Sequence, residues 1–341
     1  MKKMFYILNG NNAATYVICC NSFGNINQGL KFYRPLSLYG KLKKIFLKCV
    51  LWKIGKLKLK TLKTLEEVNA YCTDLSGKKI DFKLSENCSI LVSPTRDKII
   101  VNFHKQYFQK FAFGNSYLNV KNEIKIYKLL NSSGSFTTSE ISEIKKTKGL
   151  CSFKLYHPSS LLKTNTVPKP ENLSKILVEF FNKVSLNFIS WQDYTSGLKD
   201  KLQTSIFCDT LVLKKINSIA MDDFKLPLGL VHRDFKPWNI LNGSPLLIYD
   251  FEETIFDGPP LEDFYNFYID PIIRYKKSKY VLNVINTFEV KKALDCYLKN
   301  LNIQIPRQHL FTTFLVERIL FWESRKDLTT AKYFVNVLKA L

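Results

Sequence analysis

Three short, mainly apolar runs predict consecutive β-strands in the first half of the chain. The runs are Ser89–Val92, Lys98–Phe103 and Tyr107–Phe113, and Gly114 ends the third. In the third run, Phe108, Lys110 and Ala112 fall on one face of a strand and Gln109, Phe111 and Phe113 fall on the other. The turn between the first two runs, residues 94–97, contains no glycine. A glycine-rich loop that covers a phosphate is therefore not expected at this turn.

The pattern then changes to helical spacing and back. Leu118–Leu130 has the period of a helix, and residues 140–157 predict two more strands that complete a small sheet. A polar, proline-containing stretch follows at Ser159–Pro170, which is a plausible linker. Helical patterns dominate afterwards, in residues 173–184, 211–219, 278–298 and 311–341. The chain is therefore expected to be α+β, with strands first and helices after.

One polar segment in the helical half carries candidate chemistry. The segment Leu230–Leu241 contains Asp234 and Asn239, and Asp250 follows at the end of a short apolar run. Asn242-Gly243 between them favours a tight hairpin, which would bring Asn239 and Asp250 side by side. Amide and carboxylate oxygens suit Mg²⁺, and Asp234 would face them from the preceding loop. This is the layout of kinase-type phosphoryl transfer.

These residues also carry a family resemblance. His232–Leu241, which reads His-Arg-Asp-Phe-Lys-Pro-Trp-Asn-Ile-Leu, resembles the catalytic loop of the aminoglycoside phosphotransferase and choline kinase superfamily. Ile248–Glu252 resembles the segment with that family's metal-binding Asp, and Pro260–Phe264 resembles a later signature whose Asp braces the catalytic loop. Arg233 stands where the small-molecule enzymes more often have Gly and protein kinases have Arg, which leaves the acceptor class open.

The resemblance implies a bilobal, protein-kinase-like α+β fold. A small N-terminal β-sheet lobe with one helix would precede a mainly α-helical C-terminal lobe. The expected domains are a basic N-terminal extension at residues 1–85, the first lobe at 86–158 and the second lobe, with the catalytic loop, at 159–341.

The resemblance also implies a reaction, the ATP-dependent transfer of the γ-phosphoryl group to a hydroxyl. Asp234 would orient or deprotonate that hydroxyl, and Asn239 and Asp250 would hold Mg²⁺. Lys236 either reaches the γ-phosphate or is a solvated loop lysine. The acceptor is expected to be a small molecule, a sugar or a lipid-linked glycan. The two alternatives are a catalytically inactive scaffold and a protein kinase, although Asp250-Phe251 lacks the following Gly of protein kinases.

The strand order implies a further pair of site residues. Lys110, in the third predicted strand, is the candidate for the lysine that contacts the α- and β-phosphates of ATP. Glu123, in the following helix, would pair with it, and Lys105 is a rival for the lysine. His232 is expected to pack under the catalytic loop, and Asp263 is expected to accept N–H bonds from it.

Residues 41–65 carry nine lysines and no acid. Leu42, Ile45, Phe46, Cys49 and Trp52 fall at helical spacing, and Lys41, Lys44 and Lys48 lie on another side. Two interpretations follow. Either the segment is an interfacial helix on an anionic membrane, or it packs its apolar stripe on the domain and leaves its lysines in solvent. No nucleic-acid partner is expected, since no known binding module accompanies the charge.

Composition also bears on where the protein is located in the cell. Residues 1–170 hold 29 of the 51 Lys and Arg side chains and 9 of the 29 Asp and Glu side chains, so the net charge of +22 belongs mainly to this half. The eight cysteines form no C-x-x-C pair, which argues against a zinc site or a disulfide framework. No uncharged apolar run reaches the roughly 20 residues that span a bilayer. A cytoplasmic protein is expected, with a peripheral membrane contact as one alternative.

Overall fold

The structure is a computed structural model of the 341-residue chain. It describes residues 5–9, 14–30, 38–53, 61–78, 84, 87–104, 107–130, 134–156, 168–219, 224–241 and 245–341. The chain divides into two compact units, one of Met1–Asn131 with Thr138–Leu161 and one of Ser132–Thr137 with Leu162–Leu341. The first is built on a sheet and the second is mainly helical, so the α+β class and the order of its two parts are confirmed.

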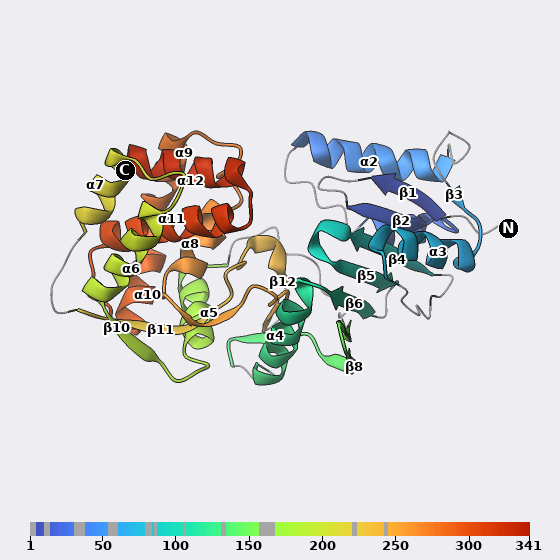
Figure 1. The fold of residues 1–341 in the computed structure, drawn as a ribbon, viewed down its shortest axis with the longest axis horizontal. Helices are drawn as coiled ribbons and strands as arrows, with labels where there is room; N and C mark the ends of the chain where they lie inside the picture. The colour runs from blue at the N-terminus through green and yellow to red at the C-terminus, as the bar shows by residue number, and fades with distance from the viewer. Residues whose placement is uncertain are drawn as a thin grey trace. The chain divides into compact units, whose positions relative to one another are not determined.

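The first unit contains one eight-stranded sheet with the order β3-β1-β2-β4-β5-β6-β9-β8 (Figure 1). Every neighbouring pair in this sheet is antiparallel. The strands are β1 (Phe5–Asn9), β2 (Thr15–Cys19), β3 (Thr61–Leu62), β4 (Cys88–Ser93), β5 (Lys98–Phe103), β6 (Tyr107–Phe113), β8 (Ile141–Thr147) and β9 (Leu150–Tyr156). All five strands predicted after residue 85 are present, within a residue or two of their expected ends.

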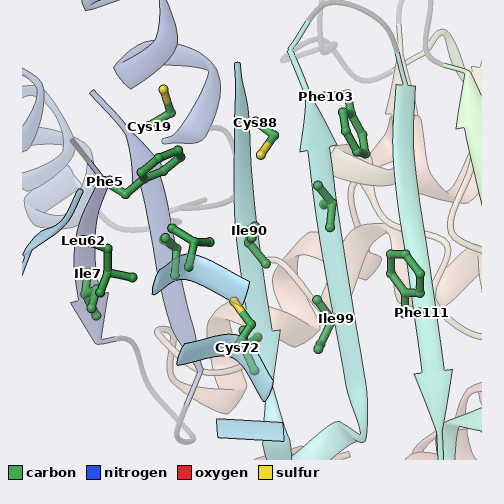
Figure 2. Close-up of a cluster of buried hydrophobic side chains, with 14 of the residues drawn as sticks. Phe5, Ile7, Cys19, Leu62, Cys72, Cys88, Ile90, Ile99, Phe103 and Phe111 are labelled. Atoms are coloured by element: carbon green, nitrogen blue, oxygen red, sulfur yellow. The ribbon is translucent and has the colours of Figure 1, made fainter. Parts of the chain in front are cut away.

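The N-terminal residues are not a separate extension in the structure. β1, β2 and β3 lengthen the sheet beyond β4, and their side chains share one apolar core with β4, β5 and β6 (Figure 2). Phe5 of β1, Ile90 of β4 and Ile99 of β5 belong to this core, which α3 (Leu65–Ser76) covers with Val68 and Cys72. Residues 1–85 and 86–158 thus fold together in one unit, because alternate side chains of all these strands point to the same face.

The opposite face of β1 and β2 has a smaller core of its own. Tyr6 and Ile18 pack there against α1 (Phe23–Gly29) and α2 (Leu38–Lys53). α2 ends at Lys53, and residues 61–62 pair with β1 as β3, so the basic segment 41–65 is not one continuous helix. β6 is followed by α4 (Ser116–Leu129), the helix predicted between strands.

The second unit consists of helices around two short sheets. β10 (Asn187–Ser190), β11 (Lys225–Val231) and β14 (Ile255–Gly258) form one sheet, and β12 (Ile240–Leu241), β13 (Leu246–Ile248) and β7 (Phe136–Thr138) form the other. The helices are α5 (Pro170–Phe181), α6 (Trp191–Gln203), α7 (Thr210–Asn217), α8 (Glu262–Ile269), α9 (Ser278–Ile285), α10 (Phe288–Asn300), α11 (Arg307–Ser324) and α12 (Leu328–Ala340).

Two of the longer predicted helical stretches are each divided in two. Residues 278–298 form α9, which ends at Ile285, and most of α10, which begins after Thr287. Residues 311–341 form most of α11 and α12, and the Asp327 side chain caps α12 by accepting the N–H of Thr330. At the second break, the short polar side chain of Asp327 thus satisfies an N–H group that a new helix leaves without a partner. Within the described ranges, no helix is long and apolar enough to cross a membrane.

Candidate active site

In the sheet unit, Lys110 and Glu123 form a buried ion pair. Lys110 Nζ lies 2.8 Å from Glu123 Oε1 and 3.0 Å from Oε2. Lys110 sits in β6 opposite Ile100 of β5 and Phe153 of β9, and α4 brings Glu123 over that position. The pairing expected from the sequence is therefore formed, and its role with a nucleotide stays a prediction. The rival Lys105 lies outside the described residues.

The turn between β4 and β5 is held by a side chain instead of being rich in glycine. Asp97 adopts a left-handed backbone with φ 45° and accepts the N–H of Asn115 at 3.0 Å. Gly114 has a φ of 51°, where a side chain is strained, and a Cβ there would lie 2.4 Å from Asp97 Oδ2, so a substitution would also displace this carboxylate. The turn between β4 and β5, which has no glycine, is therefore hydrogen-bonded to the start of α4.

In the helical unit, His232 is a structural residue of the loop His232–Leu241, as expected. Its ring is buried, and Nε2 lies 3.1 Å from the Tyr249 carbonyl oxygen, while Nδ1 accepts the N–H of Asp234 at 3.3 Å. Burial lowers the pKa of this ring, against a smaller opposing effect of Asp234 and Asp250. The two contacts fit a neutral ring that donates from Nε2 to Tyr249.

Asp263 braces the loop through both of its carboxylate oxygens. Oδ2 accepts the N–H of His232 at 2.7 Å and Oδ1 accepts the N–H of Arg233 at 2.8 Å, which confirms the role expected from the sequence. Burial raises the pKa of Asp263 to about 8, and the two N–H donors act in the opposite direction. Asn266, from the next turn of α8, donates to the Arg233 carbonyl oxygen at 3.0 Å.

Arg233 occupies a backbone conformation that favours glycine. Its φ is 61°, in the left-handed region where a side chain costs about 1 kcal/mol or more. The side chain recovers interactions, because Nε lies 3.2 Å from Glu262 Oε1 and the guanidinium stacks over the Phe321 ring. This geometry explains how Gly and Arg can both serve at this position.

Asp234 and Asn239 are joined directly. Asn239 Nδ2 donates to Asp234 Oδ2 and to the Asp234 carbonyl oxygen, both at 2.9 Å. Asn239 is buried, and Asp234 keeps 28% of its side chain exposed. Because the amide nitrogen is used in this way, the amide oxygen is the atom of Asn239 that suits a metal ion.

Asp250 follows the hairpin on its partner strand. Ile240 pairs with Ile248, and Tyr249 N–H donates to the Asn239 carbonyl oxygen at 3.2 Å. Asp250 is the next residue and has a φ of 72°, which turns the chain away from the strand. The register agrees with the predicted hairpin, whereas the Asn242-Gly243 turn itself lies outside the described residues. Asn239 and Asp250 therefore project from neighbouring points of two paired chain segments.

Lys236 is not a solvated loop lysine, which was one of the two interpretations. Only 11% of its side chain is exposed, and Nζ contacts Asp234 Oδ1 and lies 3.0 Å from Asp270 Oδ2. Burial would lower the pKa of this lysine, but Asp270 and Asp234 outweigh that effect and raise it. Asp270 in turn lies 3.5 Å from the buried Arg318. Lys236 is held as a cation beside Asp234.

The sequence missed this supporting network. Arg318 of α11 contacts Glu262 at 3.3 Å and the Arg233 carbonyl oxygen at 3.4 Å. No motif marks Arg318 or Asp270. The sequence signal that could have indicated a buried Arg318 is its position in the largely apolar helical stretch 311–341.

The acids of residues 250–270 are mostly used inside the unit. Seven acids and no base occur there. Glu253 pairs with Arg325, and Glu262, Asp263 and Asp270 serve the catalytic loop as described. These four carboxylates therefore contact protein groups.

Within the part of the chain that the structure describes, no group of three or more His, Cys, Asp or Glu side chains could hold a metal ion. Mg²⁺ differs from zinc in this respect, because it is usually bound by one or two side chains together with phosphate oxygens and water. The donor set of Asn239 and Asp250 fits that mode of binding.

Comparisons with known proteins give structural resemblance alone. No family model matches the chain, and no curated protein matches it. Among solved structures, the complex of gentamicin with aminoglycoside phosphotransferase APH(2")-IIa is 16% identical, with a TM-score of 0.44 over 71% of this chain and 88% of that one. A thermostable mutant of aminoglycoside phosphotransferase APH(4)-Ia with ADP and hygromycin B is 13% identical, with a TM-score of 0.45 over 80% and 97%. Macrolide 2'-phosphotransferase MphH from Brachybacterium faecium is 10% identical, with a TM-score of 0.46 over 71% and 88%.

Proposed function

We propose that this protein is an ATP-dependent phosphotransferase that moves the γ-phosphoryl group to a hydroxyl. The observation that carries the proposal is the arrangement around Asp234, whose two oxygens contact Asn239 Nδ2 and Lys236 Nζ. A carboxylate fixed between an amide and a buried cation is suited to orienting a hydroxyl. Positioning and charge neutralisation account for most of the catalysis in this reaction class.

The proposed step is an in-line displacement at phosphorus. The acceptor oxygen forms a bond to the γ-phosphorus while the bond to the β–γ bridging oxygen breaks, and ADP leaves. Asp234 takes the acceptor's proton, and Lys236 stabilises charge on the transferring group. Asn239 and Asp250 would hold Mg²⁺, which neutralises charge on the phosphate oxygens when bound. Lys110, oriented by Glu123, is proposed to contact the α- and β-phosphates.

Substitutions separate these roles. Asp234→Asn should abolish transfer and leave Mg·ATP binding nearly intact, whereas Asp250→Asn should also lose the Mg²⁺-dependent part of binding. Asp200→Asn, the same change at an exposed acid of α6, is the control and should alter neither property. Calorimetry measures binding, and product formation measures transfer. Full activity in Asp234→Asn contradicts the mechanism, and absence of nucleotide binding by the folded wild type favours an inactive scaffold.

We further propose that the acceptor is a glycan or a lipid-linked sugar. Protein kinases need an ordered segment after the metal-binding Asp to dock a peptide, and here that stretch is short. Ile255–Gly258 pairs with β11 as β14, so much of the stretch from Glu252 to Leu261 belongs to a sheet. The basic character of the first half of the chain suits an anionic acceptor. We also propose a cytoplasmic location, which is supported by the eight cysteines, all of which are free thiols.

Labelled ATP tests the acceptor class. The purified protein is incubated with γ-labelled ATP and fractionated cell extract, and label is measured in lipid, soluble and protein fractions. We expect label in the lipid or soluble fraction, removed by glycan-cleaving treatment and absent with Asp234→Asn. Label that stays mainly in protein after that treatment would favour a protein kinase.

A further inference from the structure

α2 has two apolar faces, and the structure uses only one of them. Leu51 is buried and Leu47 is half-buried against the small core of Tyr6 and Ile18, which fixes the helix on the sheet unit. Figure 1 shows α2 along this side of β1. Leu47 and Leu51 therefore pack α2 on the unit, and the apolar stripe of Leu42, Ile45, Phe46 and Trp52 is not part of that contact.

That stripe lies on the surface. The exposed fractions are 58% for Leu42, 58% for Ile45, 66% for Phe46 and 51% for Trp52. At about 100° per residue these four side chains fall within one sector of the helix, on the side opposite Leu47 and Leu51. The structure thus differs from the interpretation in which the stripe packs on the domain. Exposed large apolar residues gathered in this way mark an interaction surface.

A neighbouring helix extends the apolar surface. The Phe23 ring, at the first turn of α1, contacts the Trp52 ring edge to face, with centroids 5.8 Å apart. Phe23 is 46% exposed, so the pair presents two large aromatic groups at one end of the stripe. Trp is the side chain most suited to the boundary between lipid headgroups and acyl chains.

Lysines border the stripe. Lys43 is exposed on one flank, and Lys48 is half-exposed on the other. The sequence from Leu38 to Leu65 contains no acid. A second copy of this chain would set these lysines against lysines, and a nucleic-acid backbone offers nothing to bury the apolar ridge between them. An anionic lipid surface satisfies both features, because headgroups accept the lysines while the ridge enters the layer below.

We propose that the exposed face of α2, extended by Phe23, docks this protein on the surface of a membrane that contains anionic lipid. The occupant is the lipid surface itself. The proposal does not depend on catalysis, since its test measures partitioning of the whole chain and needs no substrate.

The experiment is co-sedimentation of the full-length protein with vesicles. Phosphatidylcholine vesicles with and without 30% phosphatidylserine, a composition of roughly physiological surface charge, are compared at low and high salt. We expect binding only to the vesicles with phosphatidylserine, and weaker binding as salt rises. A Lys43→Gln, Lys48→Gln variant should lose on the order of fivefold in partitioning for each lysine that contacts the surface.

A second variant removes the apolar part of the surface. Ile45→Ser with Phe46→Ser should reduce partitioning by tenfold or more, and both changes are on exposed side chains, so the unfolding temperature should be unchanged. Two controls match these variants. Lys145→Gln with Lys146→Gln changes two exposed lysines of another part of the same unit, and Phe288→Ser changes an aromatic residue that is 76% exposed.

The outcomes separate the occupants. Selective loss of vesicle binding in both α2 variants, with both controls bound as the wild type, supports the proposal. Absence of wild-type binding, or equal loss in the controls, overturns it. A dimer in gel filtration that Ile45→Ser with Phe46→Ser converts to monomer also overturns it, because a second copy would then cover the face.

Discussion

Lys236 Nζ lies 3.0 Å from Asp270 Oδ2, and this contact holds a lysine of the catalytic loop beside Asp234. Asp270 is bound on its other side by Arg318, whose guanidinium is buried against the rings of Phe321 and Trp322. A chain of charged groups therefore connects the interior of α11 to the proposed reacting hydroxyl. The position of Lys236 depends on residues that take no part in the proposed chemistry.

Asp270→Asn should destabilise the protein strongly and lower transfer. The change leaves Lys236 and Arg318 with one fewer buried counter-charge, and removal of one partner from such a group costs about 3–5 kcal/mol. Urea denaturation measures the loss. Asp295→Asn breaks the exposed contact with Arg307 and is the control, with an expected loss below about 1 kcal/mol. Equal losses in the two variants contradict a structural role for Asp270.

The Asp270 carboxylate also makes the free energy of unfolding depend on pH. Burial would raise the pKa of Asp270, but Lys236 and Arg318 outweigh it and lower the pKa below its ordinary value. Its contribution is therefore present above the unfolded-state pKa of about 3.9 and is lost as pH falls through the folded-state value. The free energy of unfolding of the wild type should decline below about pH 4 more steeply than that of Asp270→Asn. Parallel curves for the two proteins would falsify this assignment.

The Lys110–Glu123 pair can be tested for structure and function separately. Glu123→Gln leaves the Lys110 charge buried without its counter-ion, so unfolding free energy should fall by about 3–5 kcal/mol. The double change Lys110→Met with Glu123→Leu replaces the pair by apolar groups and should recover most of this loss. If Lys110 contacts ATP phosphates, nucleotide affinity stays low in the double variant despite its stability. Wild-type affinity in a stable double variant would mean that the pair is structural only.

Asp263→Asn should loosen the catalytic loop. The carboxylate accepts two backbone N–H groups, and an amide offers one oxygen and one nitrogen that cannot accept. One buried N–H then loses its partner, at a cost of about 1–3 kcal/mol. Hydrogen exchange should become faster at the amides of His232 and Arg233. Asp257→Asn, at an acid that accepts from the Asn187 side chain, should leave the exchange of both amides as in the wild type.

His232 should stay neutral below its usual pKa and carry its proton on Nε2. Burial lowers its pKa, so the unfolded chain takes up a proton at a pH where the folded ring does not. Stability from this group is therefore present above about pH 6.5 and is lost as pH falls below that value. Nitrogen chemical shifts of the ring measure both properties. A ring that titrates at pH 6.5 or above, or that carries its proton on Nδ1, contradicts this assignment.

The local elements, and the residues that lie within one loop or one strand, could be predicted from the sequence alone. The apolar runs in residues 98–113 predicted β5 and β6, and the place of Lys110 in that order predicted its partner on α4. The hairpin from Asn239 to Asp250 followed from the turn residues and two short apolar runs. These features depend on neighbours in the chain, and periodicity and turn chemistry record such neighbours directly.

Contacts between distant segments could not be predicted from the sequence, because they form only in the folded chain. Arg318 and Asp270 are 48 residues apart, and nothing in either segment specifies the other. The N-terminal strands pair with the main sheet, because their apolar side chains are buried in one core with those of β4 and its neighbours. Periodicity placed Leu42, Ile45 and Phe46 on one face of α2, but α2 has two apolar faces. Which of them is buried depends on the shape of the surface beneath the helix, and that surface exists only in the folded chain.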